Sequence, residues 1–236
     1  MNIVDLLILG IIGVSVLFGM YKGFINAIFG LFGVIAALII ACIAYPALAR
    51  SLQGNESLVR TLIHYSDASS RIHDLELSQT PVAGISEQTL TEILTRADLP
   101  EPLGDFVREN IVKGVFASLG SVNVSEYLNQ TIVAVSFNIL CFLLCFAGAY
   151  AAIMLLVHLL GYVFRLPVLK HLDLLLGGLF GGVRGVFLVF VFFLVVPVLR
   201  TVSPIDQVSE AIAQSQLAAI FNKSGLIELI MRGSLL

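Results

Sequence analysis

Charged residues are scarce in this chain: only 12% of its 236 residues are charged, whereas 58% are hydrophobic. In ordinary soluble proteins about a quarter of the residues are charged. This composition therefore excludes an ordinary soluble domain and predicts an integral membrane protein.

Common enzyme motifs are also missing. The sequence has no HExxH, GxSxG or GxxxxGK[ST] segment, and its four histidines are scattered without the spacing of metal ligands. The three cysteines, Cys42, Cys141 and Cys145, lie in apolar stretches without a CxxC pair, which favours small buried side chains over a redox site. We therefore expect no enzymatic activity, no catalytic or metal-binding residues, and no cofactor.

Four apolar runs are long enough to cross a bilayer, whose hydrocarbon core of ~30 Å takes about 20 helical residues. We expect an all-α membrane protein with transmembrane helices at residues 3–20, 24–49, about 138–163 and 174–199. The expected organisation is a transmembrane hairpin (1–49), a mostly helical insertion or lid (50–130), a second hairpin (131–200) and an amphipathic helical tail (201–236).

The insertion of residues 50–130 is acidic, with six basic and eleven acidic residues and a formal charge of −5. That charge argues against nucleic acid or an anionic membrane surface as its partner. Helical spacing of apolar residues predicts one helix in SEQTLTEILTRADL, with Ser86 as its N-cap, and another in PLGDFVRENIVKGVFASL. Asn123 or Ser125 is expected to cap the helix that leads into the third span, and residues 54–84 are expected to be irregular.

The tail shows a comparable pattern. Ser203 and Pro204 are typical of a helix start, and GLIELIMR near the end predicts a last short amphipathic helix. The apolar stripe between them stops near Asn222 and consists of Ile205, Val208, Ile212, Leu217, Ile220 and Phe221. We expect surface helices that rest on the bilayer or on the insertion.

Orientation follows from the excess of basic residues in short cytoplasmic loops. Lys22, Arg165 and Lys170 lie in the short loops of one face, whereas Arg50 and Arg200 flank the spans on the other. This three-to-two majority predicts that residues 50–130 and both termini lie outside the cytoplasm.

The segment LDLLLGGLFGGVRG, residues 172–185, places five glycines in the fourth span. They form two adjacent rows with four-residue spacing: Gly177, Gly181 and Gly185 in one row, and Gly178 and Gly182 in the other. Small residues let transmembrane helices approach closely, so the glycines predict a helix-packing face. The partner helix is expected in the same chain, with a second copy of the chain as the alternative.

Two charges fall within the spans. Arg184 lies about ten residues into the fourth span, where a charge should face protein or water; extension of its side chain to the interface is the alternative. Asp5 in the first span is either its ion-pair partner or a cap of the first helical turn. At the other end of these helices, Lys22 and Asp173 are expected to form an exposed interfacial pair.

Two stretches carry a resemblance to a known family. DLLILGIIGVSVLFGMYKGFINAIFGLFGVIAA, with its early Asp and KGF turn, resembles the amino-terminal half of the colicin V production protein (CvpA) family. LDLLLGGLFGGVRGVFLVFVFF is similar to that family's last span, with an LD pair, spaced glycines and an RG dipeptide. Residues 50–130 and the tail after Arg200 are longer than in compact members, so we expect no inherited role for them.

The resemblance implies bacterial inner-membrane proteins needed for production or export of the toxin colicin V and linked to envelope integrity and stress. Two hypotheses follow. The first is a non-catalytic scaffold or accessory factor, whose expected partners are the lipid bilayer and either a second copy of the chain or another envelope protein. The second is a small transporter or channel with a polar path past Asp5 and Arg184.

Overall fold

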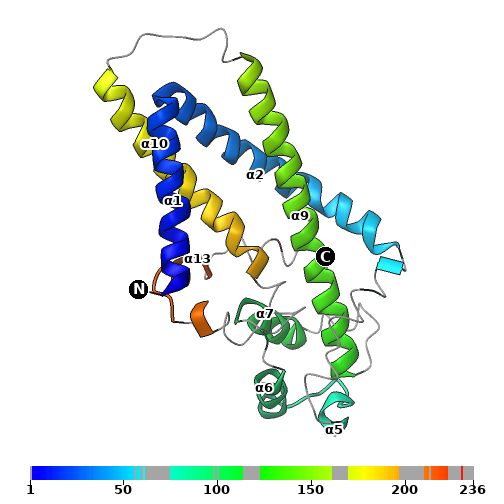
Figure 1. Ribbon diagram of the computed structural model, residues 1–236. Coiled ribbons are helices and arrows are strands. Elements are labelled where there is room, and N and C mark those ends of the chain that lie inside the picture. The colour runs from blue at the N-terminus through cyan, green and yellow to red at the C-terminus, as the bar shows by residue number, and fades with distance from the viewer. Residues whose placement is uncertain are drawn as a thin grey trace. The chain divides into compact units, whose positions relative to one another are not determined.

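The structure is a computed structural model. It describes residues 2–55, 57–58, 61, 75–97, 99, 101–113, 123–160, 170–196, 210–212, 214–222 and 230. The described chain is all-helical, as expected, and its only β-type pairing is an isolated bridge between Pro81 and Asn123. The helices are α1 (Ile3–Lys22), α2 (Phe24–Gln53), α5 (Leu75–Ser78), α6 (Glu87–Arg96), α7 (Glu101–Val112), α9 (Val124–Leu160), α10 (Lys170–Phe193) and α13 (Ala218–Asn222) (Figure 1).

Four of these helices, α1, α2, α9 and α10, are long and apolar enough to cross a membrane, which confirms the four expected spans. α1 and α2 are separated by Gly23 alone, whose φ of 82° lies in the left-handed region that favours glycine. The Gly23 amide donates the last helical hydrogen bond of α1, to the Gly19 carbonyl oxygen at 3.0 Å, and the non-helical φ of Gly23 ends the helix.

The helix that carries the third span begins at the expected cap. Asn123 accepts a hydrogen bond from the Glu126 amide at 2.9 Å, and α9 begins at Val124, ahead of the expected start of the span near residue 138. α10 ends at Phe193, and residues 197–199 of the expected span lie outside the described residues.

The chain divides into two compact units. The first unit consists of residues 1–46, 140–195 and 206–223, and thus holds α1, α10, α13, most of α2 and the second half of α9. α1 packs along α10, as the blue and yellow helices of Figure 1 show. Tyr45 of α2 and Phe142 of α9 meet edge to face, with ring centroids 6.0 Å apart.

The second unit consists of residues 47–139, 196–205 and 224–236. Ser86 caps α6 as predicted, accepting the Thr89 amide hydrogen at 3.1 Å, and the predicted apolar positions Leu90 and Ile93 are buried. α7 buries Phe106 and Val107 and is tied to α6 by a hydrogen bond from Arg108 to the Thr91 hydroxyl at 3.2 Å.

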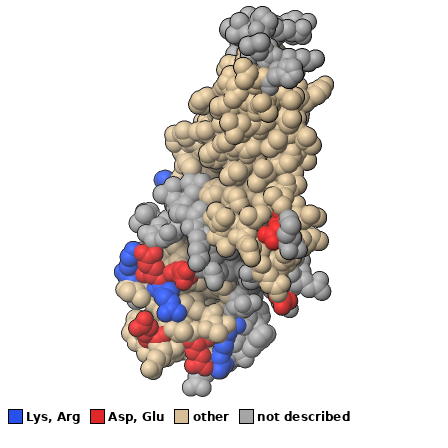
Figure 2. Space-filling view, turned by 90° about the vertical axis from the view of Figure 1, so that its left-hand side faces the viewer, with Lys and Arg blue, Asp and Glu red and all other residues tan. Residues whose placement is uncertain are grey.

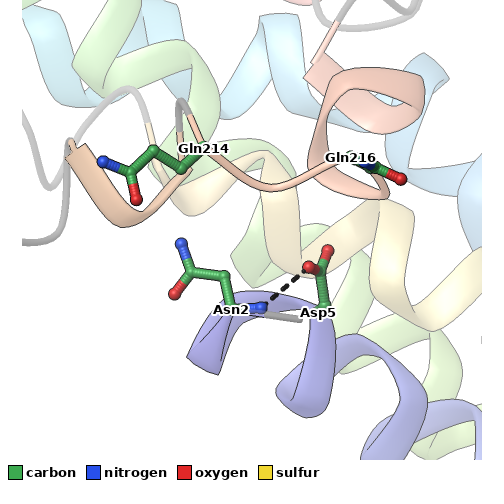
Figure 3. Close-up of a pocket in the computed structure, with 4 residues that line it drawn as sticks. All are labelled: Asn2, Asp5, Gln214 and Gln216. Carbon is green, nitrogen blue, oxygen red and sulfur yellow. Dashed lines mark hydrogen bonds between the residues drawn. The ribbon is translucent and has the colours of Figure 1, made fainter.

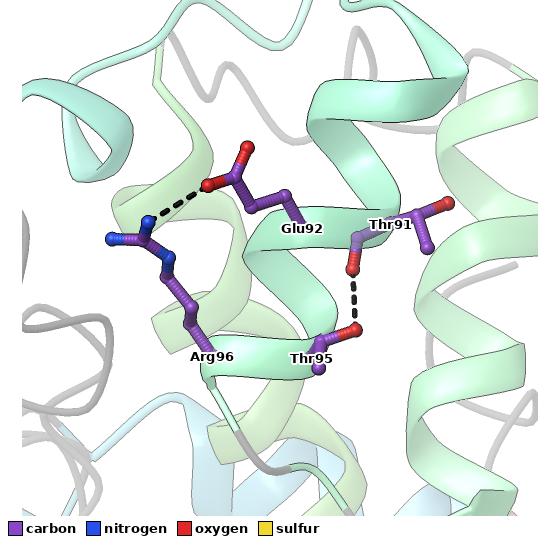
Figure 4. A network of polar contacts seen from close by, with 4 residues as sticks. All are labelled: Thr91, Glu92, Thr95 and Arg96. Carbon is purple, nitrogen blue, oxygen red and sulfur yellow. Dashed lines mark hydrogen bonds and ion pairs between the residues drawn. The ribbon is translucent and has the colours of Figure 1, made fainter.

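The solvent-facing side of α6 shows why this helix is stable at the surface (Figure 4). Arg96 pairs with Glu92 one turn earlier at 2.8 Å, and the Thr95 hydroxyl donates to the Thr91 carbonyl oxygen. Figure 2 shows acidic and basic side chains interspersed on the second unit, whereas the visible surface of the first unit is mostly uncharged.

Two sequence predictions are tested only in part. The first, the irregular stretch 54–84, contains α5, and much of the rest lies outside the described residues. The second, the tail helix from Ser203, also starts outside them; within residues 210–222 it is interrupted at Ser215 and resumes as α13, which ends at Asn222 as expected. Nearly all of GLIELIMR is outside the described residues.

Candidate functional site

The closest helix contact of the first unit joins α1 to α10, which run antiparallel. A Cβ atom on Gly19 of α1 would lie 2.2 Å from the carbonyl oxygen of Gly177 and 2.9 Å from the Cα atom of Gly181. Both distances are shorter than real Cβ atoms show, so the two backbones touch where only glycine fits. We call Ser15, Gly19, Gly177, Gly181 and Gly185 the glycine seam.

The two glycine rows of α10 are not equivalent. Gly177 and Gly181 meet backbone atoms of α1, with a Cβ position 2.5 Å from the carbonyl oxygens of Gly19 and Ser15 respectively, and Gly185 meets the Cα atom of Ile12 at 3.0 Å. Gly178 and Gly182 meet only the side chains of Met20 and Val16. Side chains can move and backbone cannot, so the first row sets the helix spacing.

A buried hydrogen bond crosses the glycine seam. The Ser15 hydroxyl donates to the Gly181 carbonyl oxygen at 2.7 Å, and Ser15 is only 3% exposed. Serine is small enough for close helix approach and adds an interhelical hydrogen bond, the combination by which helices associate in lipid, where apolar burial gives little driving force.

Arg184 projects from α10 between α1 and α2. Its guanidinium carbon lies 5.2 Å from the centroid of the Phe18 ring, and its Nη1 atom would be 3.0 Å from a Cβ on Gly30 of α2. Side chains in a helix tilt toward the helix N-terminus. Because α10 is antiparallel to α1, this tilt directs Arg184 toward the Lys22 end of α1 and away from Asp5.

Asp5 is buried at the opposite end of α1, where it joins that helix to the tail. One carboxylate oxygen accepts the Asn2 amide hydrogen at 3.0 Å. The other accepts the Ser215 hydroxyl at 2.5 Å and the Leu217 amide at 3.3 Å. Ser215 in turn accepts the Ala218 amide at 3.0 Å, as an N-cap does. We call this set of contacts between Asn2, Asp5 and residues 211–218 the tail latch.

The direct Asp5–Arg184 ion pair is not present in the structure. Asp5 lies in the first turn of α1 and Arg184 contacts Phe18, roughly 20 Å further along that helix at ~1.5 Å per residue. The alternative in which Asp5 caps the first turn is the one observed, because Asn2 and Asp5 form a capping box.

Lys22 and Asp173 do not form an ion pair either. An oxygen of Asp173 accepts the Phe24 amide hydrogen at 2.7 Å and so satisfies a free donor in the first turn of α2. Lys22 instead places its ammonium nitrogen 5.4 Å from the centroid of the Phe18 ring. The Asp173 carboxylate therefore bonds to the N-terminus of α2 and not to the exposed Lys22 ammonium group.

A polar pocket of about 450 Å³ adjoins the tail latch and is lined by Asn2, Asp5, Gln214 and Gln216. Figure 3 shows Asn2 and Asp5 projecting from the first turn of α1 toward the segment that carries the two glutamines. The Asn2 side-chain amide also donates to the Ala211 carbonyl oxygen at 2.6 Å. The pocket therefore lies at the junction between α1 and the tail.

The contributions of Ser15, Gly19 and Ser215 were missed by reasoning from the sequence. A signal for the first two existed, since Ser15, Gly19 and Gly23 repeat every four residues, as the glycines of α10 do. Ser215 precedes an apolar run and has the character of an N-cap, but nothing local connects it with Asp5.

Within the part of the chain that the structure describes, no group of three or more His, Cys, Asp or Glu residues is placed to hold a metal ion.

Comparison with known proteins bears on the same segments. No curated protein and no solved structure matches the chain.

A family model does match. The model described as colicin V production protein covers residues 4–73 and 111–225, which include α1, α2, α9, α10 and α13. Residues 74–110, which contain α5, α6 and most of α7, are left out, in line with an insertion. The match does cover residues 50–73 and 111–130 of the expected insertion and the tail as far as residue 225, so these parts belong to the matched range. The chain is a multi-pass helical membrane protein that belongs to the colicin V production protein family.

Proposed function

We propose that this protein is a non-catalytic scaffold or accessory factor of the bacterial inner membrane, which supports toxin production or export and the integrity of the envelope under stress. The observation that carries the proposal is the glycine seam. It fixes α1 against α10 by backbone contact, and a fixed helix pair is suited to present a constant surface to a partner.

The positions of the two intramembrane charges favour this function over transport. A polar path would require Asp5 and Arg184 to face a common space. Asp5 is instead occupied by the tail latch, and Arg184 lies over Phe18 near the other end of α1. Asp5 and Arg184 therefore lie in different surroundings and do not face a common space.

The outer surface of the helix pair supports a role in assembly. Large apolar side chains of α1 and α10 remain exposed, among them Leu17 at 66%, Val14 at 67% and Leu175 at 67%. Lipid covers such a surface in a membrane, and a partner helix can replace lipid at little cost, since neither environment is preferred by apolar side chains. The partner would be an envelope protein or a second copy of the chain.

The test combines crosslinking with a transport assay. A photoreactive amino acid at Leu17 or Leu175 should give defined adducts with one or a few membrane proteins, whereas the same probe at the buried Val34 should give none. Gly181→Leu, which disrupts the glycine seam, should remove the adducts and colicin V export together.

The contrary result is also specific. If the purified protein alone, in liposomes, carries a solute or ion flux that Arg184→Gln abolishes, the scaffold function is wrong and the protein is a transporter or channel.

A further inference from the structure

The Phe18 ring of α1 is contacted by two cations from different helical positions. The Lys22 ammonium nitrogen lies 5.4 Å from the ring centroid and the Arg184 guanidinium carbon 5.2 Å. Both distances are within the range of cation–π attraction. Two positive charges are thereby gathered at the Lys22 end of the α1–α10 pair.

Neither cation is neutralised by an acidic side chain within the described residues. The ion pairs found there are those of Arg96 with Glu92 and Lys113 with Glu109. Asp173, the acidic residue at this end of α10, is engaged by the Phe24 amide. The Nε atom of Arg184 is buried without any hydrogen-bond partner. A cation near lipid with unused donors is costly unless an anion accompanies it.

The surroundings of the two cations are apolar and exposed. Phe18 is 45% exposed, and Leu17 and Val14 on the same helix are 66% and 67% exposed. A ligand that fits must therefore combine an anionic group with long hydrocarbon chains. A phospholipid does so, and basic pockets between transmembrane helices bind anionic headgroups in this way.

We propose that Lys22, Phe18 and Arg184 form a specific site for the phosphate group of an anionic phospholipid. Lys22 and Arg184 hold the phosphate, with Arg184 supplying directed N–H donors. Phe18 keeps both cations in place, and the acyl chains lie along Leu17 and Val14. This site is independent of the proposed scaffold function.

The experiment uses the purified full-length chain in detergent micelles. Phosphatidylglycerol or phosphatidylcholine is titrated in, and bound lipid is counted by native mass spectrometry while the midpoint of thermal unfolding is recorded. Phosphatidylglycerol should bind more tightly than phosphatidylcholine and raise the midpoint. Lys22→Gln and Arg184→Gln should each weaken phosphatidylglycerol binding about fivefold, as expected for one lost cation near a charged headgroup.

Arg50→Gln is the matched control, because it removes an exposed cation from the last turn of α2, which belongs to the second unit and not to the unit that holds Phe18. It should leave lipid binding unchanged. Lys22 is also exposed, so Lys22→Gln should fold even if Arg184→Gln does not, and Arg184→Lys should retain part of the affinity.

Three results would overturn the site: equal affinity for the two lipids, an equal loss in Arg50→Gln and Lys22→Gln, or unchanged binding in Lys22→Gln. A fourth arm adds inorganic phosphate without phosphatidylglycerol. If phosphate alone raises the unfolding midpoint as much as the lipid does, the occupant is a free anion and the lipid assignment is wrong.

Discussion

Ser15 of α1 and Gly181 of α10 are joined by a hydrogen bond of 2.7 Å, although 166 positions separate them in sequence. The bond exists because a Cβ atom on Gly181 would fall 2.5 Å from the Ser15 carbonyl oxygen, so the glycine permits the approach that brings the serine hydroxyl into range. Backbone contact and hydrogen bond therefore depend on each other.

The glycine seam should be intolerant of even one methyl group. Gly181→Ala and Gly19→Ala should lower the midpoint of thermal unfolding in detergent, and Gly181→Leu should reduce the yield of folded protein far more than Leu174→Ala. Gly13→Ala is the matched control, since a Cβ there meets nothing within 4 Å and alanine is the better helix former by about 1 kcal/mol. Equal effects of Gly13→Ala and Gly181→Ala would show that the close approach is not what stabilises the pair.

Ser15→Ala should cost stability by about 0.6 kcal/mol, the average for interhelical hydrogen bonds in a membrane protein. The change keeps a small side chain and removes only the donor to Gly181. Comparison of unfolding midpoints for Ser15→Ala and Ser15→Val separates the two roles of this residue, because valine also adds volume in the glycine seam. If Ser15→Ala loses as much stability as Ser15→Val, the hydrogen bond and not the small size of Ser15 dominates.

The tail latch should behave as one unit. Asp5→Ala and Ser215→Ala each remove the same hydrogen bond, so each should speed hydrogen exchange at the Leu217 and Ala218 amides, and the double variant should add little. Gln214→Ala, at an exposed position with no hydrogen bond to Asp5, is the control.

By contrast, the losses of stability from Asp5→Ala and Arg184→Ala should add, because these side chains are not in contact. Strong coupling between the two changes in a double-mutant cycle would contradict the geometry.

The parts of this fold that sequence predicts are those set by local pattern. The length of the apolar runs predicted the four spans, Ser86 predicted the start of α6, and the four-residue repeat of Gly177, Gly181 and Gly185 marked the face that lies against α1. The partner face was harder to choose, since α1 also carries Gly10 and Gly13, which meet nothing. Small residues occur all around this helix, so their presence alone does not select a side.

Charged residues were harder to place, because their partners are backbone groups and ring faces. Asp5 and Asp173 both bond to amides at helix ends, and the two nearest cations contact Phe18. Pairing of opposite charges by their depth in the membrane leaves out the backbone amides and the Phe18 ring, which bind these charged groups instead. The direction of Arg184 was nonetheless available from helix geometry, since the side-chain tilt of an antiparallel helix points it away from Asp5.

The buried hydroxyl group of Thr131, in the second unit, should be dispensable for stability. The hydroxyl oxygens of Tyr127 and Thr131 and the amide nitrogen of Asn110 are buried, and none of them makes a hydrogen bond of good geometry. An unsatisfied buried group costs about 1–3 kcal/mol, so Thr131→Val should leave stability unchanged or raise it. Thr95→Val is the control, because its hydroxyl is exposed and bonds to the Thr91 carbonyl oxygen. A loss of more than about 1 kcal/mol in Thr131→Val would mean that the hydroxyl is satisfied, for example by bound water.

The orientation in the membrane is testable with single cysteines in a background where Cys42, Cys141 and Cys145 are replaced by alanine. Basic residues gather at the α1–α2 turn and in the connection between α9 and α10, so this end should face the cytoplasm and α6 the periplasm. Thr95→Cys, exposed on α6, should react with a membrane-impermeant maleimide in cells with a permeabilised outer membrane. Tyr21→Cys, at a position 85% exposed beside the α1–α2 turn, should react only after the inner membrane is broken.

Ile93→Cys is the control for burial, since Ile93 is 0% exposed and should stay unlabelled in both conditions until the protein is denatured. Labelling of Tyr21→Cys before Thr95→Cys would reverse the orientation and place the lipid site of Lys22 and Arg184 in the outer leaflet.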